Sequence, residues 1–466
     1  MIASLKHIWM VCLTGLGCLV LLVIKMQWQS DIVIQISRLH SSTSYPASGE
    51  KFITYLPHSG LHNQRIALIN AMVLAKQLNR TLIMPELNLG RANYWRESRK
   101  LERQLSECPL RATINKAEVG HGTSCYGYAR YVPSTVSSVF DLSAVASLGI
   151  RVTQRLDMGL DYFQRQYGIS ANQMHYIRDA SRFSYRIFDH RNNQMDMKNY
   201  EQRIDIEDLQ ARQEQVLVFG SLFSSNRLAL EQPDLVWLWD YLFTEVAFHH
   251  PTVMQQALDI VGRLGGPGQF VSLHLRTGDG VFKAVMDQTF QKVQLQLYSS
   301  QQQQEHSFED GALLTDDDVL ILSALNEIQD PTDRLDACLK LQPSNPFVTG
   351  PAVALNPRLR LIYMATDAPD PRRTLHHLYA EFPCLFSLSD FPDVITATLT
   401  AHALSPFTED QQPSRLGPLL FPLIDAEIAS HGSLFVGTAK STFSKYIMYR
   451  NNRFLTYYPQ HKPVIA

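Results

Sequence analysis

The sequence of 466 residues lacks a surplus of charge of either sign, since 42 lysines and arginines stand against 44 aspartates and glutamates. Nucleic-acid-binding proteins usually carry a basic excess, so nucleic acid is not expected as a partner. Glycine and proline are few, at 23 each, and 45% of the residues are hydrophobic, which excludes a collagen-like or disordered chain. A large folded protein is the remaining expectation: at roughly 150 residues per domain the length prior is about three, so two large domains or one very large domain are the choices.

Long hydrophobic runs are also scarce, and the one that exists lies near the start. Residues 8–24 are uncharged and would form a helix about 26 Å long, enough to cross a thin bilayer. A cleaved signal peptide is the alternative, although residues 24–28 make a poor cleavage site. We expect a cytoplasmic tail (1–7), a transmembrane signal anchor (8–24) and a polar stem (25–50). This predicts a single-pass type II membrane protein of the endoplasmic reticulum or Golgi with its bulk in the lumen.

Only six cysteines are present, and two of them fall in the predicted anchor. No CxxC pair or Cys/His ligand spacing occurs, so a zinc site is not expected. The other four allow three disulfide connectivities, of which local pairing of Cys108 with Cys125 and of Cys338 with Cys384 is favoured. The glycosylation triplet at residues 79–81 also fits a secretory location.

Strand-like and helix-like segments alternate, which predicts an α/β fold. Residues 51–57 and 81–85 have strand character, and residues 64–78 between them carry helical hydrophobic spacing. Such a βαβ unit implies a parallel sheet. The Gly-Pro-rich stretch at residues 265–268 predicts a boundary between an N-terminal domain (51–264) and a C-terminal domain (265–466).

The loop after the first predicted strand concentrates polar side chains. Ligands of open parallel sheets bind at the carboxyl ends of the strands, so this loop is a candidate site. Gly60 permits a tight turn, Asn63 is predicted as the N-cap of the following helix, and His58 and His62 are nearby. An ordinary strand-to-helix turn with a capping asparagine is the alternative.

The segment 270–279 carries the strongest signal. Strand alternation places His274 and Arg276 on one face, and Asp279 follows them. The planar guanidinium of arginine matches phosphate oxygens in a bidentate manner, and an aspartate beside it would hold it in place. A buried Arg–Asp pair that only stabilises a turn is the competing interpretation.

Two further loops follow predicted strands. Asp367 comes after the strand at 359–366, where its carboxylate could accept donors from a guanine edge or from ribose hydroxyls, or simply cap a helix. Residues 437–444 join the strand at 433–438 to a helix, and hydroxyls with free amides at a helix N-terminus form an anion site. Serine and threonine are also the commonest helix caps.

In this order and spacing, the blocks that begin at residues 55, 274, 363 and 441 resemble the GDP-fucose protein O-fucosyltransferase family over about residues 51–455. The resemblance implies a GT-B architecture, in which two Rossmann-like domains face a cleft, the first on the acceptor side and the second binding the GDP-sugar. It implies inverting transfer of fucose from GDP-fucose to a hydroxyl of a secretory-pathway glycoprotein or glycan, with no metal or other cofactor.

The resemblance also implies roles for single residues. Arg276 would grip the diphosphate and act in catalysis. The animal members place a catalytic Arg or Glu in the first loop, where this sequence has Gly60 and Leu61, so His58 or His62 is expected as the base. The expected donor-binding residues are Asn63, His274, Arg276, Asp279, Asp367, Ser441, Thr442 and Phe443.

Two other functions compete with this one. The acidic stretch Asp316–Asp318 could hold a metal ion in a metal-dependent glycosyltransferase, but the acids precede the hydrophobic residues instead of ending a strand, which favours Thr315 or Asp316 as a helix cap. A non-catalytic lumenal homologue that binds a nucleotide sugar or a glycoprotein is the second alternative. The changed first loop is the feature that supports it.

Overall fold

The computed structural model describes residues 49–90, 95–114, 125, 131–278, 282, 291, 295, 315–342, 356–403 and 416–459. Residues 51–466 form one compact unit, distinct from residues 1–50. The predicted tail, anchor and nearly all of the stem lie outside the described residues. Within the described ranges, no helix has the length and hydrophobicity needed to cross a bilayer.

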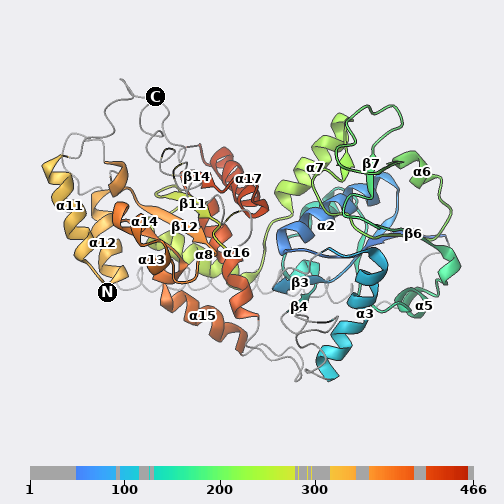
Figure 1. Ribbon diagram of the computed structural model, residues 1–466, viewed down its shortest axis with the longest axis horizontal. Coiled ribbons are helices and arrows are strands. Elements are labelled where there is room, and N and C mark those ends of the chain that lie inside the picture. The colour runs from blue at the N-terminus through green and yellow to red at the C-terminus, as the bar shows by residue number, and fades with distance from the viewer. Residues whose placement is uncertain are drawn as a thin grey trace, which may run out of the picture. The chain divides into compact units, whose positions relative to one another are not determined.

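A five-stranded parallel sheet organises the first half of the compact unit (Figure 1). Its strands, in spatial order, are β5 (Val152–Gln154), β2 (Thr81–Met84), β1 (Phe52–Tyr55), β9 (Val216–Phe219) and β6 (Met174–Ile177). Helix α2 (Leu61–Gln77) joins β1 to β2 and is buried along most of its length. The predicted βαβ unit is confirmed, and the strands β1, β2 and β9 are buried at every position, as is typical of a parallel sheet covered on both faces.

A four-stranded parallel sheet organises the second half. Its strands, in spatial order, are β13 (Leu385–Phe386), β12 (Ile362–Thr366), β11 (Val271–Leu275) and β14 (Leu434–Gly437). Val271, Leu273 and Leu275 share one hydrophobic cluster, as the predicted alternation requires. The opposite face carries Ser272 and His274, both buried. The α/β class with parallel sheets is therefore confirmed.

Helices pack around the second sheet. Helix α16 (Gly417–Ser430) contacts β11 and β12, and it also packs against α8 (Pro251–Arg263), α15 (Pro392–Ala403) and α17 (Thr442–Tyr457) (Figure 1). Helix α8 precedes the Gly-Pro stretch at residues 265–268, yet it packs against the helices α15 and α16 of the second half. The division between residues 264 and 265 stays a prediction.

Smaller elements complete the fold. The strands of a three-stranded parallel sheet are β10 (Leu228–Ala229), β7 (Tyr185–Phe188) and β8 (Gln202–Asp205), and β3 (Leu87–Gly90) pairs antiparallel with β4 (Tyr131–Ser134). The remaining α-helices among the described residues are α3 (Ser98–Ile114), α4 (Ser143–Ser147), α5 (Tyr162–Tyr167), α6 (Ile206–Gln210), α7 (Pro233–Glu245), α11 (Asp316–Glu327), α12 (Pro331–Leu341), α13 (Pro371–Thr374) and α14 (His376–Glu381).

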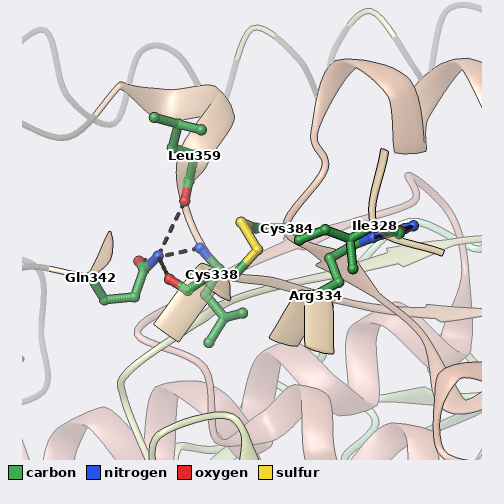
Figure 2. Close-up of a disulfide and its surroundings, with 7 residues drawn as sticks. Ile328, Arg334, Cys338, Gln342, Leu359 and Cys384 are labelled. Carbon is green, nitrogen blue, oxygen red and sulfur yellow. Dashed lines mark hydrogen bonds between the residues drawn. A yellow bond between two sulfur atoms is a disulfide. The ribbon is translucent and has the colours of Figure 1, made fainter. Parts of the chain in front are cut away.

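Both predicted disulfides are confirmed. Cys108 of α3 is bonded to Cys125, and Cys338 of α12 is bonded to Cys384, which directly precedes β13. Figure 2 shows the second bond beside Gln342, whose Nε2 donates to the carbonyls of Cys338 and Leu359. The disulfide attaches α12 to the edge strand of the second sheet, and the bond from Gln342 to Leu359 attaches it to the segment before β12.

Helix α17 links the two halves, because it contacts α2 and α7 as well as α16 and β14. The fully buried Arg65 of α2 lies at this junction, where its Nε donates to the Val246 carbonyl over 2.6 Å. Its guanidinium also lies over the rings of Phe243 and Tyr446, at 4.5 and 4.8 Å. This contact brings the first turn of α2 close to the first turn of α17.

Candidate functional site

The loop that follows β11 carries Arg276. Its backbone amide donates to Thr438 Oγ1 over 3.1 Å, and Thr438 Oγ1 donates in turn to the His274 carbonyl over 2.7 Å. Thr438 directly follows β14, so one side chain ties the ends of two neighbouring strands. The Arg276 guanidinium is half-buried and lies 4.9 Å from the centre of the Phe282 ring.

Asp367 holds the same loop from the other side. Its carboxylate accepts from the Thr277 amide (2.6 Å), the Thr277 hydroxyl (3.1 Å) and the Gly278 amide (3.2 Å). The side chain of Asp367 therefore braces the backbone next to Arg276 and does not cap a helix. Asp279, the expected partner of Arg276, lies outside the described residues.

The first turn of α17 lies beside this loop. Ser441 is its N-cap, and the Ser441 hydroxyl accepts from the Ser444 amide, which confirms the predicted cap. Amides in the first turn of a helix point out along its axis, so those of Thr442 and Phe443 are donors directed away from the helix. Together with the positive end of the helix dipole they form a position suited to an anion.

His274 connects β11 to this turn. Its Nδ1 lies 2.6 Å from the Ser444 hydroxyl, and its ring centre is 4.7 Å from that of Phe443. Burial, and secondarily the charge of Arg276, lowers the pKa of His274 to about 3. The ring is therefore neutral and ties β11 to α17 as an uncharged hydrogen-bonding group.

His62 reaches the same place from the first half of the chain. Its ring packs against Phe443 (4.8 Å between centres), Tyr446 (5.2 Å) and Phe248 (5.5 Å). Burial, followed by the charge of Arg65, holds the pKa of His62 well below its usual range. Within the described part of the chain, its buried Nδ1 has no hydrogen-bond partner.

The prediction that Asn63 caps α2 is wrong. The helix begins at Leu61 with Gly60 as its N-cap, and the Gly60 carbonyl accepts from the amides of Asn63 and Gln64. Glycine in an extended conformation starts the helix earlier than the asparagine would, which places Asn63 inside the first turn. Its side-chain Oδ1 is buried and, among the described residues, lacks a hydrogen-bond partner.

His58 has different surroundings. Its Nε2 lies 2.6 Å from the Ser221 hydroxyl and its Nδ1 lies 2.8 Å from the Ser59 hydroxyl, so both ring nitrogens are occupied. Burial, followed by the charges of Arg227 and Arg182, lowers the pKa of His58 to about 3. These contacts tie the end of β1 to the end of β9. The described contacts do not join His58 to the cluster around His62.

Sequence reasoning missed three residues of this arrangement. Thr438 and Ser444 lie within the predicted loop at 437–444, but a cap pattern does not show that their side chains reach β11. Tyr446 anchors the cluster from α17, where its hydroxyl accepts from the Phe248 amide over 3.1 Å. An aromatic residue one turn after a capping serine was the available signal.

The acidic stretch behaves as a helix start. Thr315 and Asp318 form a reciprocal capping box on α11, and Asp318 also accepts from Asn356 Nδ2 over 3.3 Å. The predicted helix cap is confirmed. In the part of the chain that the structure describes, no group of three His, Cys, Asp or Glu side chains is arranged to hold a metal ion.

The chain is similar to several known proteins. A 122-residue stretch is 31% identical to O-fucosyltransferase 30 of Arabidopsis thaliana, covering 24% of this chain and 22% of that protein. A crystal structure of POFUT1 in complex with GDP-fucose aligns over 87% of this chain and 95% of its own, with 10% identity and a TM-score of 0.37. Fucosyltransferase NodZ from Bradyrhizobium aligns over 86% and 93%, with 10% identity and a TM-score of 0.33.

The sequence model described as GDP-fucose protein O-fucosyltransferase matches residues 164–453. The match includes the Arg276 loop, Asp367 and the start of α17, and it begins after the first loop with its two histidines. More than half of the chain is covered. The chain belongs to the GDP-fucose protein O-fucosyltransferase family.

Proposed function

We propose that this protein transfers fucose from GDP-fucose to a hydroxyl of a protein or glycan acceptor, with inversion at the sugar carbon. The main support for this proposal is that hydrogen bonds through Thr438, His274 and Ser444 hold Arg276 and the first turn of α17 together. A guanidinium beside a helix N-terminus offers charge and directed donors to a diphosphate.

The donor would lie along this edge of the second sheet. In this proposal Arg276 binds the diphosphate, the amides after Ser441 bind its remaining oxygens, and the Phe443 ring packs on the guanine. Asp367 would contact the guanosine with the acceptor capacity that Thr277 and Gly278 leave open, since a carboxylate has about four lone-pair positions. Asn63, His274 and Asp279 complete the donor set that we propose.

The departing GDP is the main target of catalysis in this scheme. As the bond from the sugar to the diphosphate oxygen breaks, negative charge grows on GDP, and Arg276 with the α17 N-terminus stabilises it. The acceptor oxygen attacks the opposite face of the sugar, which inverts the configuration. No metal ion is needed when fixed positive groups supply this stabilisation.

The proton of the acceptor hydroxyl needs a base. His58 is engaged at both nitrogens, whereas His62 lies in the cluster with Phe443 and has an unpartnered Nδ1 among the described residues. We therefore assign the proton to His62. Its lowered pKa makes it a weak base, which suffices when the proton leaves late, after the bond to GDP has largely broken.

We further propose the GT-B arrangement for the two parallel sheets and a lumenal location for the compact unit, with residues 8–24 as its membrane anchor in the endoplasmic reticulum or Golgi. Two disulfides support an oxidising compartment, because such bonds rarely persist in the cytosol. Fractionation of tagged protein, followed by protease protection of intact microsomes, tests this location. Digestion of the compact unit by protease added to sealed microsomes would contradict it.

The donor is tested by incubating the full-length protein with a panel of GDP- and UDP-sugars and measuring nucleotide release, with and without EDTA. Of the sugars in the panel, we expect only GDP-fucose to yield free nucleotide, and we expect EDTA to leave the rate of GDP release unchanged. Release of UDP from a UDP-sugar would refute the donor assignment, and loss of activity in EDTA would refute metal independence. Binding of GDP-fucose without GDP release in the presence of glycoprotein acceptors would identify a non-catalytic homologue.

A further inference from the structure

The backbone around Arg276 is fixed by side chains from both neighbouring strands. Thr438 after β14 bonds to the His274 carbonyl and the Arg276 amide, while Thr366 at the end of β12 donates to the Leu275 carbonyl over 2.8 Å. Three consecutive residues of β11 and its loop are thus tied down at the point where the strand ends.

Thr438 occupies the central position in this arrangement. Thr438 is only 3% exposed, and its single hydroxyl donates to the His274 carbonyl and accepts from the Arg276 amide, which belong to two adjacent peptide groups. A hydroxyl that satisfies two backbone groups at once fixes the direction in which the chain leaves the strand. That direction determines where the Arg276 side chain starts.

We propose that Thr438 is a positioning residue, which sets the Arg276 guanidinium against the first turn of α17 through the Arg276 backbone and does not itself contact the nucleotide. The inference rests on the proposed function, because it assigns a purpose to the geometry of the donor site. Displacements of about 1 Å in a binding group cost large factors in rate or affinity, so a small change in this hydrogen bond has a measurable effect.

A purely structural role would give a different result. Removing any buried hydroxyl costs stability, on the order of 1–3 kcal/mol when its partners stay unpaired, whether or not a site is nearby. A positioning role predicts in addition a selective loss of nucleotide affinity in protein that is still folded. Stability and affinity must therefore be measured on the same variants.

The test compares Thr438→Val, which keeps the shape and removes the hydroxyl, with Thr438→Ser, which keeps the hydroxyl. Thr398→Val is the matched control, since Thr398 is also fully buried and its hydroxyl donates to the Val394 carbonyl within α15 over 2.8 Å. Thermal unfolding, the Kd for GDP by calorimetry, and the kcat and KM for GDP-fucose are measured for each full-length protein.

We expect Thr438→Val to raise the Kd for GDP and the KM for GDP-fucose at least about tenfold, Thr438→Ser to stay within about threefold of the wild type, and Thr398→Val to lose stability without a change in Kd. Wild-type affinity in Thr438→Val, or an equal loss in Thr398→Val, would overturn the positioning role. A wild-type protein that neither binds GDP nor uses GDP-fucose would instead refute the proposed function, and the role of Thr438 with it.

Hydrogen exchange gives a second measurement that needs no variant. The Arg276 amide donates to a buried hydroxyl, so it should exchange slowly in the wild-type protein, at a rate close to those of the β11 amides. Fast exchange at Arg276 would show that Thr438 does not hold the backbone, and would overturn the inference even if Thr438→Val failed to fold.

Discussion

Buried histidines should make this protein sensitive to acid in a way that can be assigned to single residues. His58 and His274 each have a pKa lowered to about 3, chiefly by burial. In the unfolded chain a histidine takes up its proton below about pH 6.5. In the folded state the same histidine stays neutral down to about pH 3. Each histidine therefore reduces the free energy of unfolding as the pH falls from about 6.5 to about 3.

The size of the effect follows from the two pKa values. Between pH 7 and pH 5 the unfolded state gains about 2 kcal/mol per histidine from proton binding that the folded state forgoes. Buried carboxyls act in the opposite direction. Burial raises the pKa of Glu86 and of Asp425 to about 7 and that of Asp179 to about 6, so these groups bind protons in the folded state first and stabilise it as the pH falls. The histidine contribution must therefore be isolated by comparison of variants.

His274→Asn isolates it, because asparagine can reproduce the hydrogen bond from Nδ1 to Ser444 and does not titrate. Urea unfolding at pH 7 and pH 5 should show a pH-dependent loss of stability smaller by about 2 kcal/mol than in the wild type. Ser444→Ala is the control, since it removes the same hydrogen bond but keeps the buried ring. An identical pH dependence in His274→Asn and the wild type would refute the reasoning.

Four other substitutions have defined outcomes. In Gly437→Ala the new Cβ would lie 2.9 Å from Ser444 Cβ, so we expect the α17 N-terminus to shift and GDP affinity to fall about tenfold. Gly262→Ala in α8 is the control, because the new Cβ meets open space, and it should raise the free energy of unfolding by up to about 1 kcal/mol. Calorimetry of GDP binding and thermal unfolding are measured for both variants, and wild-type GDP affinity in Gly437→Ala would contradict the prediction. Cys338→Ser opens a disulfide with a sequence separation of 46, which frees the unfolded chain from a closed loop of that length and should cost about 4 kcal/mol in urea unfolding. A cost below about 1 kcal/mol would contradict this estimate from the entropy of the unfolded chain. Thr315→Ala removes the cap of α11 and should lower the free energy of unfolding by about 1 kcal/mol without changing GDP-fucose turnover. A loss of turnover would indicate that the acidic stretch Asp316–Asp318 takes part in the reaction.

Local patterns predicted the elements of this fold because each depends on nearby residues. The alternation in residues 270–276 gave the correct faces of β11, and Ser441 and Thr315 were recognisable as caps from the residues that follow them. The start of α2 was misplaced because glycine and asparagine compete for the same cap position. In the structure the extended backbone of Gly60 took that position.

Contacts between distant segments were beyond sequence reasoning. No pattern near Asp367 indicated that its carboxylate accepts from Thr277 and Gly278, 90 and 89 positions away. His58 and His62 were equivalent candidates in the sequence, and only their neighbours, Ser221 for one and Phe443 for the other, separate them. Such pairings depend on how the sheets and helices pack, which no short motif encodes.

The central claim is that Arg276 and the first turn of α17 bind and stabilise the diphosphate of GDP-fucose. Its most direct test is the rate of GDP release from GDP-fucose by the wild type and by Arg276→Ala, with unfolding curves to verify that both are folded. We predict a rate at least about 100-fold lower in Arg276→Ala, the cost typical of removing one donor that stabilises transition-state charge. Turnover by folded Arg276→Ala at the wild-type rate would contradict the account.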